Sequence, residues 1–237
     1  MMSPSERIQQ NLLSINYDIH SACSRAGREY SAVKLVAVTK YAEWPWVEAL
    51  SKFQLAFGEN RPQQLSERQP LLPHVEWHLI GQLQRNKVRL ALEHAALIHS
   101  VGSLKLLKRI YEVATELRIR PRVLLQMNMS LEISKSGFAV QELVSAWPEI
   151  VRMGDSVHID GLMTMAAEAD HPEDARPAFR SLRILRDHLI TRDDSRNAGL
   201  VLPELSMGMS GDFVPAIEEG ATLVRIGSRV FMGLQPI

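Results

Sequence analysis

A lysine closes the most apolar short run in the first quarter of the chain. Residues 33–40 read Val-Lys-Leu-Val-Ala-Val-Thr-Lys, so Lys40 stands at the end of the run. The centre of the run is typical of a strand buried on both faces, as in a parallel sheet. The carboxyl ends of such strands form the rim where α/β proteins place their sites. At that rim a lysine amine can lose its proton and attack a carbonyl carbon to form a Schiff base.

Two loops rich in small residues lie near the other end of the sequence. Residues 206–211 read Ser-Met-Gly-Met-Ser-Gly, and residues 225–228 read Arg-Ile-Gly-Ser. Glycine lets the backbone approach a ligand closely, and serine hydroxyls add hydrogen-bond donors. Gly208 or Gly227 taken singly could serve only a strand-to-helix turn. Together they follow the last two predicted strands, where barrel proteins most often bind phosphate. A Schiff-base lysine with a phosphate cradle suggests pyridoxal 5′-phosphate (PLP).

Two further residues could contact such a ligand, and both have a structural alternative. Arg225 interrupts the apolar run Leu-Val-Arg-Ile at 223–226. A charge there is costly unless it is paired or bound to something. The alternatives are a salt bridge with an inward carboxylate and a hydrogen bond to a ring nitrogen of the ligand. Asn60 follows a predicted strand, where it could face the ligand or cap the next helix.

Three histidines occur singly within apolar runs, at His78, His99 and His158. A lone histidine in such a run is predicted to be a hydrogen-bonded core residue. No spacing of His, Cys and Asp indicates a metal site.

Composition limits the class of protein. The chain has 237 residues, of which 46% are hydrophobic, enough for a single domain over 1–237. Lys+Arg and Asp+Glu both total 27, so no basic excess points to nucleic acid. The single cysteine, Cys23, excludes an intrachain disulfide and favours a cytoplasmic location. No signal core and no apolar run of roughly 20 residues indicates a membrane partner.

Short apolar runs alternate with helical patterns along the chain. A first helix is expected to start after Ser3 or Ser5 and to run towards Gly27, with an apolar stripe on one face. The predicted strands are 33–39, 54–58, 75–80, 96–100, 121–128, 157–164, 203–206 and 222–226. The predicted helices between them are 44–52, 60–69, 84–93, 103–117, 139–147, 173–191 and 212–219.

This alternation predicts right-handed crossovers and a parallel sheet. Eight strands in this length favour an α/β fold of the (β/α)8 TIM-barrel type, for which ~250 residues is typical. The alternative is an open doubly wound sheet. It ranks second because no Gly-x-Gly-x-x-Gly turn follows the first strand.

The chain resembles the pyridoxal phosphate homeostasis proteins of the YggS/PROSC type from about residue 6 to residue 233. No single motif is specific, but eight of them together are. The motifs are residues 37–40, 57–60, 78–87, 99–101, 134–138, 161–164, 205–210 and 224–228.

The resemblance implies a single alanine-racemase-like barrel with an extra N-terminal helix and no second β domain. It also implies that PLP is held as a Schiff base on Lys40 and that Arg225 meets its pyridine nitrogen. Asn60 and Met207 would line the ring pocket. The implied phosphate contacts are Ser206, Gly227 and Ser228, with Gly208 and Ser210 in the loop around them.

The resemblance further implies a protein that carries and buffers PLP in vitamin B6 and amino-acid homeostasis, without catalytic residues. A guanidinium beside the ring nitrogen disfavours the pyridinium on which strong PLP electron sinks depend. Of the tyrosines, Tyr41 alone is expected near the rim, so a second acid/base group is not evident. We therefore expect a cytoplasmic monomer that hands PLP to apo-enzymes. The alternatives are a weak PLP-dependent amino-acid racemase and a Schiff-base aldolase-type barrel enzyme acting on a sugar phosphate.

Overall fold

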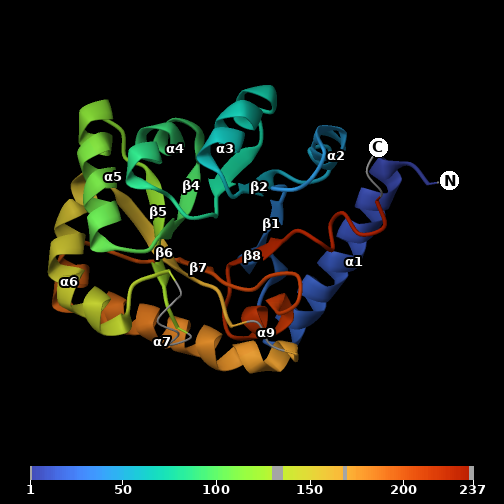
Figure 1. The fold of residues 1–237 in the computed structure, drawn as a ribbon. Helices are drawn as coiled ribbons and strands as arrows, with labels where there is room; N and C mark the ends of the chain where they lie inside the picture. Colours follow the sequence, from blue (N-terminus) through green and yellow to red (C-terminus); the bar gives the residue numbers. More distant parts are fainter. Residues whose placement is uncertain (1, 130–135, 168–169, 235–237) are drawn as a thin grey trace.

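Eight parallel strands close into a barrel in the computed structural model, which describes residues 2–129, 136–167 and 170–234 (Figure 1). The strands follow chain order, and β1 pairs with β8 to close the sheet. The predicted (β/α)8 barrel is confirmed, and the open sheet is excluded by that pairing. Each predicted strand lies within two residues of the observed one. The strands are β1 (Lys34–Val38), β2 (Ala56–Glu59), β3 (Glu76–Leu79), β4 (Leu97–Val101), β5 (Arg122–Met127), β6 (His158–Thr164), β7 (Glu204–Ser206) and β8 (Leu223–Ile226).

Helices surround the barrel on its outer side. In the part of the chain that the structure describes, none is long and apolar enough to cross a membrane. The α-helices are α1 (Pro4–Arg25), α2 (Trp44–Leu50), α3 (Pro62–Arg68), α4 (Val88–His94), α5 (Leu104–Leu117), α6 (Val140–Arg152), α7 (Arg176–Thr191), α8 (Asp193–Asn197) and α9 (Phe213–Glu218). Short 3-10 turns lie at Tyr30–Ala32, Gln69–Leu71, Arg85–Lys87, Met153–Asp155 and Pro172–Ala175.

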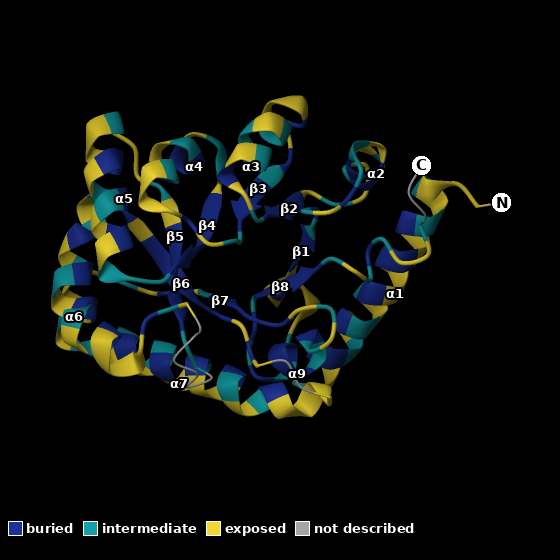
Figure 2. Cartoon of the chain, in the orientation of Figure 1, coloured by how far each residue is buried: buried dark blue, intermediate teal, exposed yellow. Residues whose placement is uncertain are grey.

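The strands are buried on both faces, as their apolar runs predict (Figure 2). Side chains alternate across each strand. Leu35 and Ala37 of β1 belong to the large core between the sheet and the helices. Val36, between them, belongs to a small separate cluster with residues of five other strands, which fills the barrel. This inner cluster is Val36, Ala56, Leu97, Leu124, Met163 and Leu223.

Helix α1 begins where the sequence predicts. The Ser3 hydroxyl accepts from the Glu6 backbone N–H and the Glu6 carboxylate accepts from the Ser3 N–H, which is a capping box. The apolar stripe of α1 is buried. The Asn11 side chain also donates to the carbonyls of Val230 and Met232, 3.0 Å from each oxygen. Helix α1 is thereby joined to the segment that follows β8, which lies beside it in Figure 1.

Two elements differ from the sequence prediction. Helix α6 continues through Pro148, although proline lacks the N–H for the intrahelical bond. Trp147 and Ile150 on either side are fully buried, and the Trp147 indole donates to Ser195 Oγ at 2.8 Å. This packing outweighs the lost hydrogen bond. Ser195 lies on α8, a short helix that the sequence did not predict. Residues 134 and 135 of one family motif lie outside the described residues.

Candidate functional site

A cavity of about 690 Å³ lies at the carboxyl ends of the strands. Loops after β1, β2, β3, β7 and β8 contribute to its wall, as expected for a barrel site. Six of the nine predicted site residues line it. These are Lys40, Asn60, Ser210, Arg225, Gly227 and Ser228.

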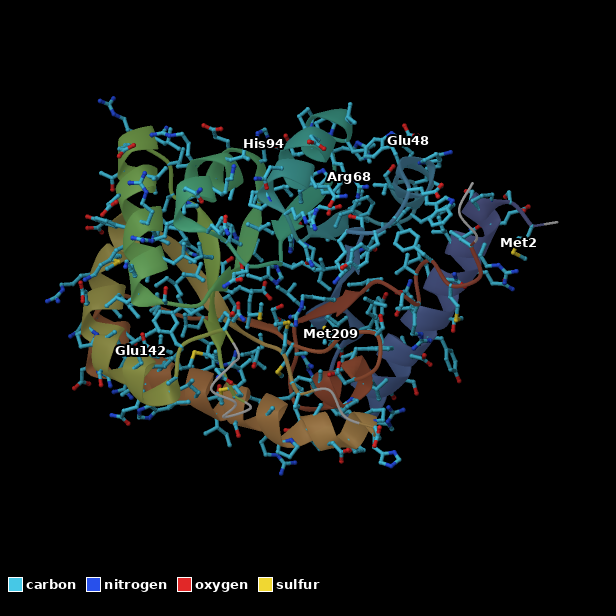
Figure 3. The ribbon with its side chains drawn as sticks, in the orientation of Figure 1. Met2, Glu48, Arg68, His94, Glu142 and Met209 are labelled. Carbon is cyan, nitrogen blue, oxygen red and sulfur yellow. The ribbon has the colours of Figure 1, made fainter. Side chains whose placement is uncertain are left out.

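Lys40 is partly exposed, and its Nζ lies 4.9 Å from the centroid of the Tyr41 ring. The loop that carries it is held by α3. Arg68 donates from Nη1 to the Thr39 carbonyl and from Nη2 to the Ala42 carbonyl, each at 2.9 Å. Lys40 therefore stands between two anchored carbonyls. Figure 3 labels Arg68 on α3.

A buried carboxylate holds Arg68 in turn. Glu59 has no exposed surface, and its Oε1 accepts from Arg68 Nη1 at 2.7 Å and from Thr39 Oγ1 at 2.5 Å. Burial raises the pKa of Glu59, against the opposing effects of the Thr39 hydrogen bond and the Arg68 charge. This anchor was not predicted from the sequence. The structural alternative for neighbouring Asn60 is not observed, because α3 is preceded by Arg61 and has no side-chain cap.

The loops after β7 and β8 are joined by hydrogen bonds. The Gly227 N–H donates to Ser210 Oγ at 3.2 Å, and the Arg225 N–H donates to the Gly208 carbonyl at 3.0 Å. Gly208 has φ +90°, and Gly227 lies close to Val38, where an added Cβ would come within 3.2 Å of the Val38 Cβ. Both predicted loops thus form one continuous wall of the cavity.

Arg225 is 4% exposed, and the hydrogen bonds of its side chain to the described residues go to neutral acceptors. Its Nη1 donates to Ser206 Oγ at 2.5 Å and its Nη2 to the Thr164 carbonyl at 3.0 Å. Among the described residues, no carboxylate forms a salt bridge with Arg225. The structure therefore gives no support to the alternative in which Arg225 pairs with an inward carboxylate. Burial lowers the pKa of Arg225 to about 10, while the Asp212 charge acts to raise it. At neutral pH the group therefore stays cationic at the cavity wall.

The charged side chains that line the cavity among the described residues are all cationic. Lys40 and Arg225 both line the cavity, and no carboxylate does within 2–129, 136–167 and 170–234. The serine hydroxyls and glycine backbone of the two loops add neutral donors. This donor set fits an anionic ligand such as a phosphate ester.

Three predicted residues do not line the cavity. Ser206, Met207 and Gly208 lie just behind its wall, and the first two are fully buried. The Ser206 hydroxyl contacts His99 Nδ1 at 2.8 Å as well as Arg225. Their direct contact with a ligand stays a prediction.

The histidines divide into two groups. His78 and His99 are buried and hydrogen-bonded to each other at 2.8 Å, as expected of core histidines. His158 differs, because its side chain is 48% exposed at the start of β6 and lies 2.8 Å from Asp160.

The cavity wall also has an apolar part that was not predicted from the sequence. Trp46 of α2 and Phe231, which follows β8, stack with ring centroids 6.2 Å apart. The Trp46 indole N–H is buried and has no hydrogen-bond partner in the described part of the chain. Because β1 and β8 are neighbours only after the barrel closes, no local sequence signal brings these rings together. Met165 and Met209 also line the cavity, and Figure 3 labels Met209 near the centre of the molecule.

We expect Gly208→Ala to lower the free energy of unfolding by about 1–3 kcal/mol, because an L-residue at positive φ is strained. An added Cβ would also come within 2.6 Å of the Ala216 Cβ. The matched control is Gly211→Ala in the same loop, where the added Cβ meets nothing within 4 Å. Urea unfolding of both variants measures the difference. Equal stabilities would show that the turn at Gly208 adapts without cost.

Comparison with known proteins agrees with this geometry. The family model described as "Alanine racemase, N-terminal domain" matches residues 11–235. The pyridoxal phosphate homeostasis protein of Aquifex aeolicus is 38% identical over 216 residues, covering 90% of this chain and 92% of the relative.

Two solved structures extend the comparison. PipY of Synechococcus elongatus, solved with PLP bound, is 34% identical with a TM-score of 0.79, covering 94% of this chain and 99% of PipY. Alanine racemase of Clostridium difficile, in complex with cycloserine, has a TM-score of 0.71 at 16% identity. It covers 98% of this chain and 60% of the racemase, and it shows the fold alone. The resemblance read from the eight motifs is thus confirmed, and the chain belongs to the family of pyridoxal phosphate homeostasis proteins, which has the fold of the alanine racemase N-terminal domain.

Proposed function

We propose that this protein binds PLP in the cavity, holds it as a Schiff base on Lys40, and carries and buffers the cofactor in vitamin B6 and amino-acid homeostasis. The observation that carries the proposal is the cavity wall, where a lysine and an arginine meet two serine- and glycine-containing loops without a described carboxylate. When bound, PLP supplies an aldehyde, which condenses with a primary amine and releases water.

Each group of residues has a distinct task in this proposal. Ser210, Ser228 and the backbone at Gly227 bind the phosphate. Arg225 donates a hydrogen bond to the ring nitrogen. Lys40 supplies the amine, and no other lysine lines the cavity within the described ranges. Asn60 orients the ring. Met207, just behind the present wall, would complete the ring pocket, and Gly208 forms part of the loop around the phosphate.

Arg225 also favours a carrier over a racemase. A guanidinium keeps its own proton near neutral pH, so it does not protonate the ring nitrogen. An unprotonated ring stabilises a carbanion poorly. Tyr41, the one tyrosine that lines the cavity among the described residues, is 86% exposed and is poorly held as an acid/base group.

The deciding experiment is the absorbance spectrum of the purified protein mixed with PLP, before and after borohydride, followed by mass mapping of the modified peptide. We expect a band near the visible edge and a reduced adduct on the peptide that contains Lys40. If the protein takes up no PLP, the proposed function is wrong. If the adduct lies on another lysine, the assignment of the Schiff base to Lys40 is wrong.

Carrying also implies transfer to apo-enzymes. If transfer is direct, the rate at which an apo-enzyme acquires PLP rises with apo-enzyme concentration and exceeds the rate of PLP release into buffer. If the apo-enzyme never acquires PLP faster than this protein releases it into buffer, transfer is not direct. The protein would then act only by buffering free PLP.

Three expectations accompany the proposal. Residues 1–237 form one domain, the protein is a monomer, and it works in the cytoplasm. A single cooperative unfolding transition, light scattering and cell fractionation test them in that order.

A further inference from the structure

Five polar side chains form a continuous hydrogen-bonded series inside the barrel. Glu76 Oε1 lies 3.1 Å from His78 Nε2, and His78 Nδ1 lies 2.8 Å from His99 Nε2. His99 Nδ1 lies 2.8 Å from Ser206 Oγ, which accepts from Arg225 Nη1 at 2.5 Å. The series begins at the amino end of β3 and reaches the cavity at the opposite end of the barrel.

We propose that Glu76, His78, His99 and Ser206 form a positioning relay that runs through the barrel and holds Arg225 in place as a donor facing the cavity. The proposal rests on the proposed function, because it assigns Arg225 to a cavity ligand. The relay itself is a property of the protein without PLP and can be tested in that state.

The chemistry of the two ends fixes the direction of every hydrogen bond. A carboxylate only accepts and a guanidinium only donates. Glu76 must therefore accept a hydrogen bond from the Nε2–H of His78. This leaves His78 Nδ1 as an acceptor for the Nε2–H of His99. The Nδ1 of His99 then accepts from the Ser206 hydroxyl. The oxygen of Ser206 is left to accept from Arg225.

The protonation states agree with this direction. The His78 hydrogen bond holds the pKa of Glu76 at about 2, aided by Lys34 and opposed by burial, so Glu76 stays ionised at neutral pH. Burial lowers the pKa of His78, and it lowers that of His99 well below its usual value. Both rings are therefore neutral, with one donor and one acceptor nitrogen each.

Charged groups at the amino end of the barrel hold the outer end of the relay. The Lys34 ammonium pairs with the second oxygen of Glu76, and Arg122 Nη1 lies 3.8 Å from the first. Arg122 also pairs with Asp160 of β6 at 2.6 Å. Glu76 is thus fixed by strands β1 and β5 as well as by its own strand.

The relay assigns Ser206 a different task from the one that the family resemblance implies. Its hydroxyl hydrogen is directed to His99, so it has no proton to donate to a phosphate. Ser206→Ala would weaken PLP binding under either assignment. Glu76→Gln separates them, because Glu76 lies outside the cavity at the far end of the barrel.

The first test uses protein without PLP, labelled with ¹⁵N-histidine and assigned with single His→Gln variants. At neutral pH we expect His78 and His99 to be neutral, each protonated at Nε2 and bare at Nδ1. A proton on Nδ1 of either ring, or a charged ring, would overturn the relay, whether or not the protein binds PLP.

The second test compares Glu76→Gln with Glu48→Gln, an exposed glutamate on α2. We expect Glu76→Gln to mix the histidine tautomers, to speed hydrogen exchange at the Arg225 guanidinium, and to raise the dissociation constant for PLP about threefold or more, about 0.7 kcal/mol. Glu48→Gln should change none of these. If Glu76→Gln leaves guanidinium exchange unchanged, the relay does not position Arg225. Should the wild type bind no PLP, the proposed function fails, and the two NMR measurements still decide the relay.

Discussion

Lys40→Ala is expected to abolish the PLP fraction that borohydride can trap, and to leave only weak, reversible binding. The amine is lost, but Arg225 and the loops after β7 and β8, which we propose bind the phosphate, remain. Among the described residues, Lys40 is also one of the two cations that line the cavity. The reversible affinity should therefore fall as well, roughly tenfold or more by analogy with one lost charge-assisted contact. Absorbance titration with PLP, with and without borohydride, measures both effects.

Lys52→Ala is the matched control, since Lys52 is exposed and lies on the loop that follows α2. It should retain the trappable PLP of the wild type. Full trapping in Lys40→Ala would mean that another amine forms the bond, and the chemistry assigned to the end of β1 would be wrong. Lys40→Ala should leave the protein folded, because Lys40 is partly exposed and its side chain is not part of the core. A loss of trapping can therefore be attributed to the missing amine.

The parts of the site that follow strand ends could be predicted from sequence. Lys40, Asn60 and Gly227 each lie within two residues of the end of a buried strand, and the order of strands determines that their loops share one face. The shared face follows from the number of strands and their parallel direction, and it does not depend on the register between them. The loops are therefore placed correctly even though the predicted strand boundaries differ from the observed ones by one or two residues.

Contacts between strands could not be predicted in the same way. His78 pairs with Leu97 in the β3–β4 register, and this places His99, two residues further on, beside the His78 ring. A shift of one residue would turn one ring to the other face of the sheet. The Glu59–Arg68 pair has the same origin, because Arg68 reaches Glu59 only after α3 folds back on β2. Neither pair has a signal in the local sequence.

The Glu59–Arg68 pair gives the largest stability effect that we expect. Arg68→Ala should lower the free energy of unfolding at pH 7 by about 3–5 kcal/mol, the usual cost of leaving a buried charge without its partner. The Glu59 side chain has no exposed surface and that of Arg68 is 13% exposed, so solvent cannot replace the lost contact. Arg89→Ala is the control, because its pair with Glu116 is about half exposed and should contribute under about 1 kcal/mol. Denaturant unfolding of both variants provides the comparison.

The decrease in the free energy of unfolding caused by Arg68→Ala should also depend on pH. Burial already raises the pKa of Glu59, and removal of the Arg68 charge raises it further. When the folded-state pKa of an acid is raised, the native state binds more protons than the unfolded state, so stability falls as pH rises through that window. The deficit of Arg68→Ala should therefore be smaller at pH 5 than at pH 8. A deficit that grows towards pH 5 would show that the lost contact was not with an ionised Glu59.

A double variant separates the two tasks of Arg68. In Glu59→Gln/Arg68→Met the buried charge and its partner are removed together, so most of the lost stability should return. The Thr39 and Ala42 carbonyls on either side of Lys40 still lack their donor. The Lys40 loop should then remain loosely held, and the double variant should trap PLP more slowly than the wild type although it is nearly as stable. If stability and trapping rate recover together, Arg68 acts on Lys40 only through the stability of the fold. If stability alone recovers, the β1–α2 loop depends on α3 for the position of its amine.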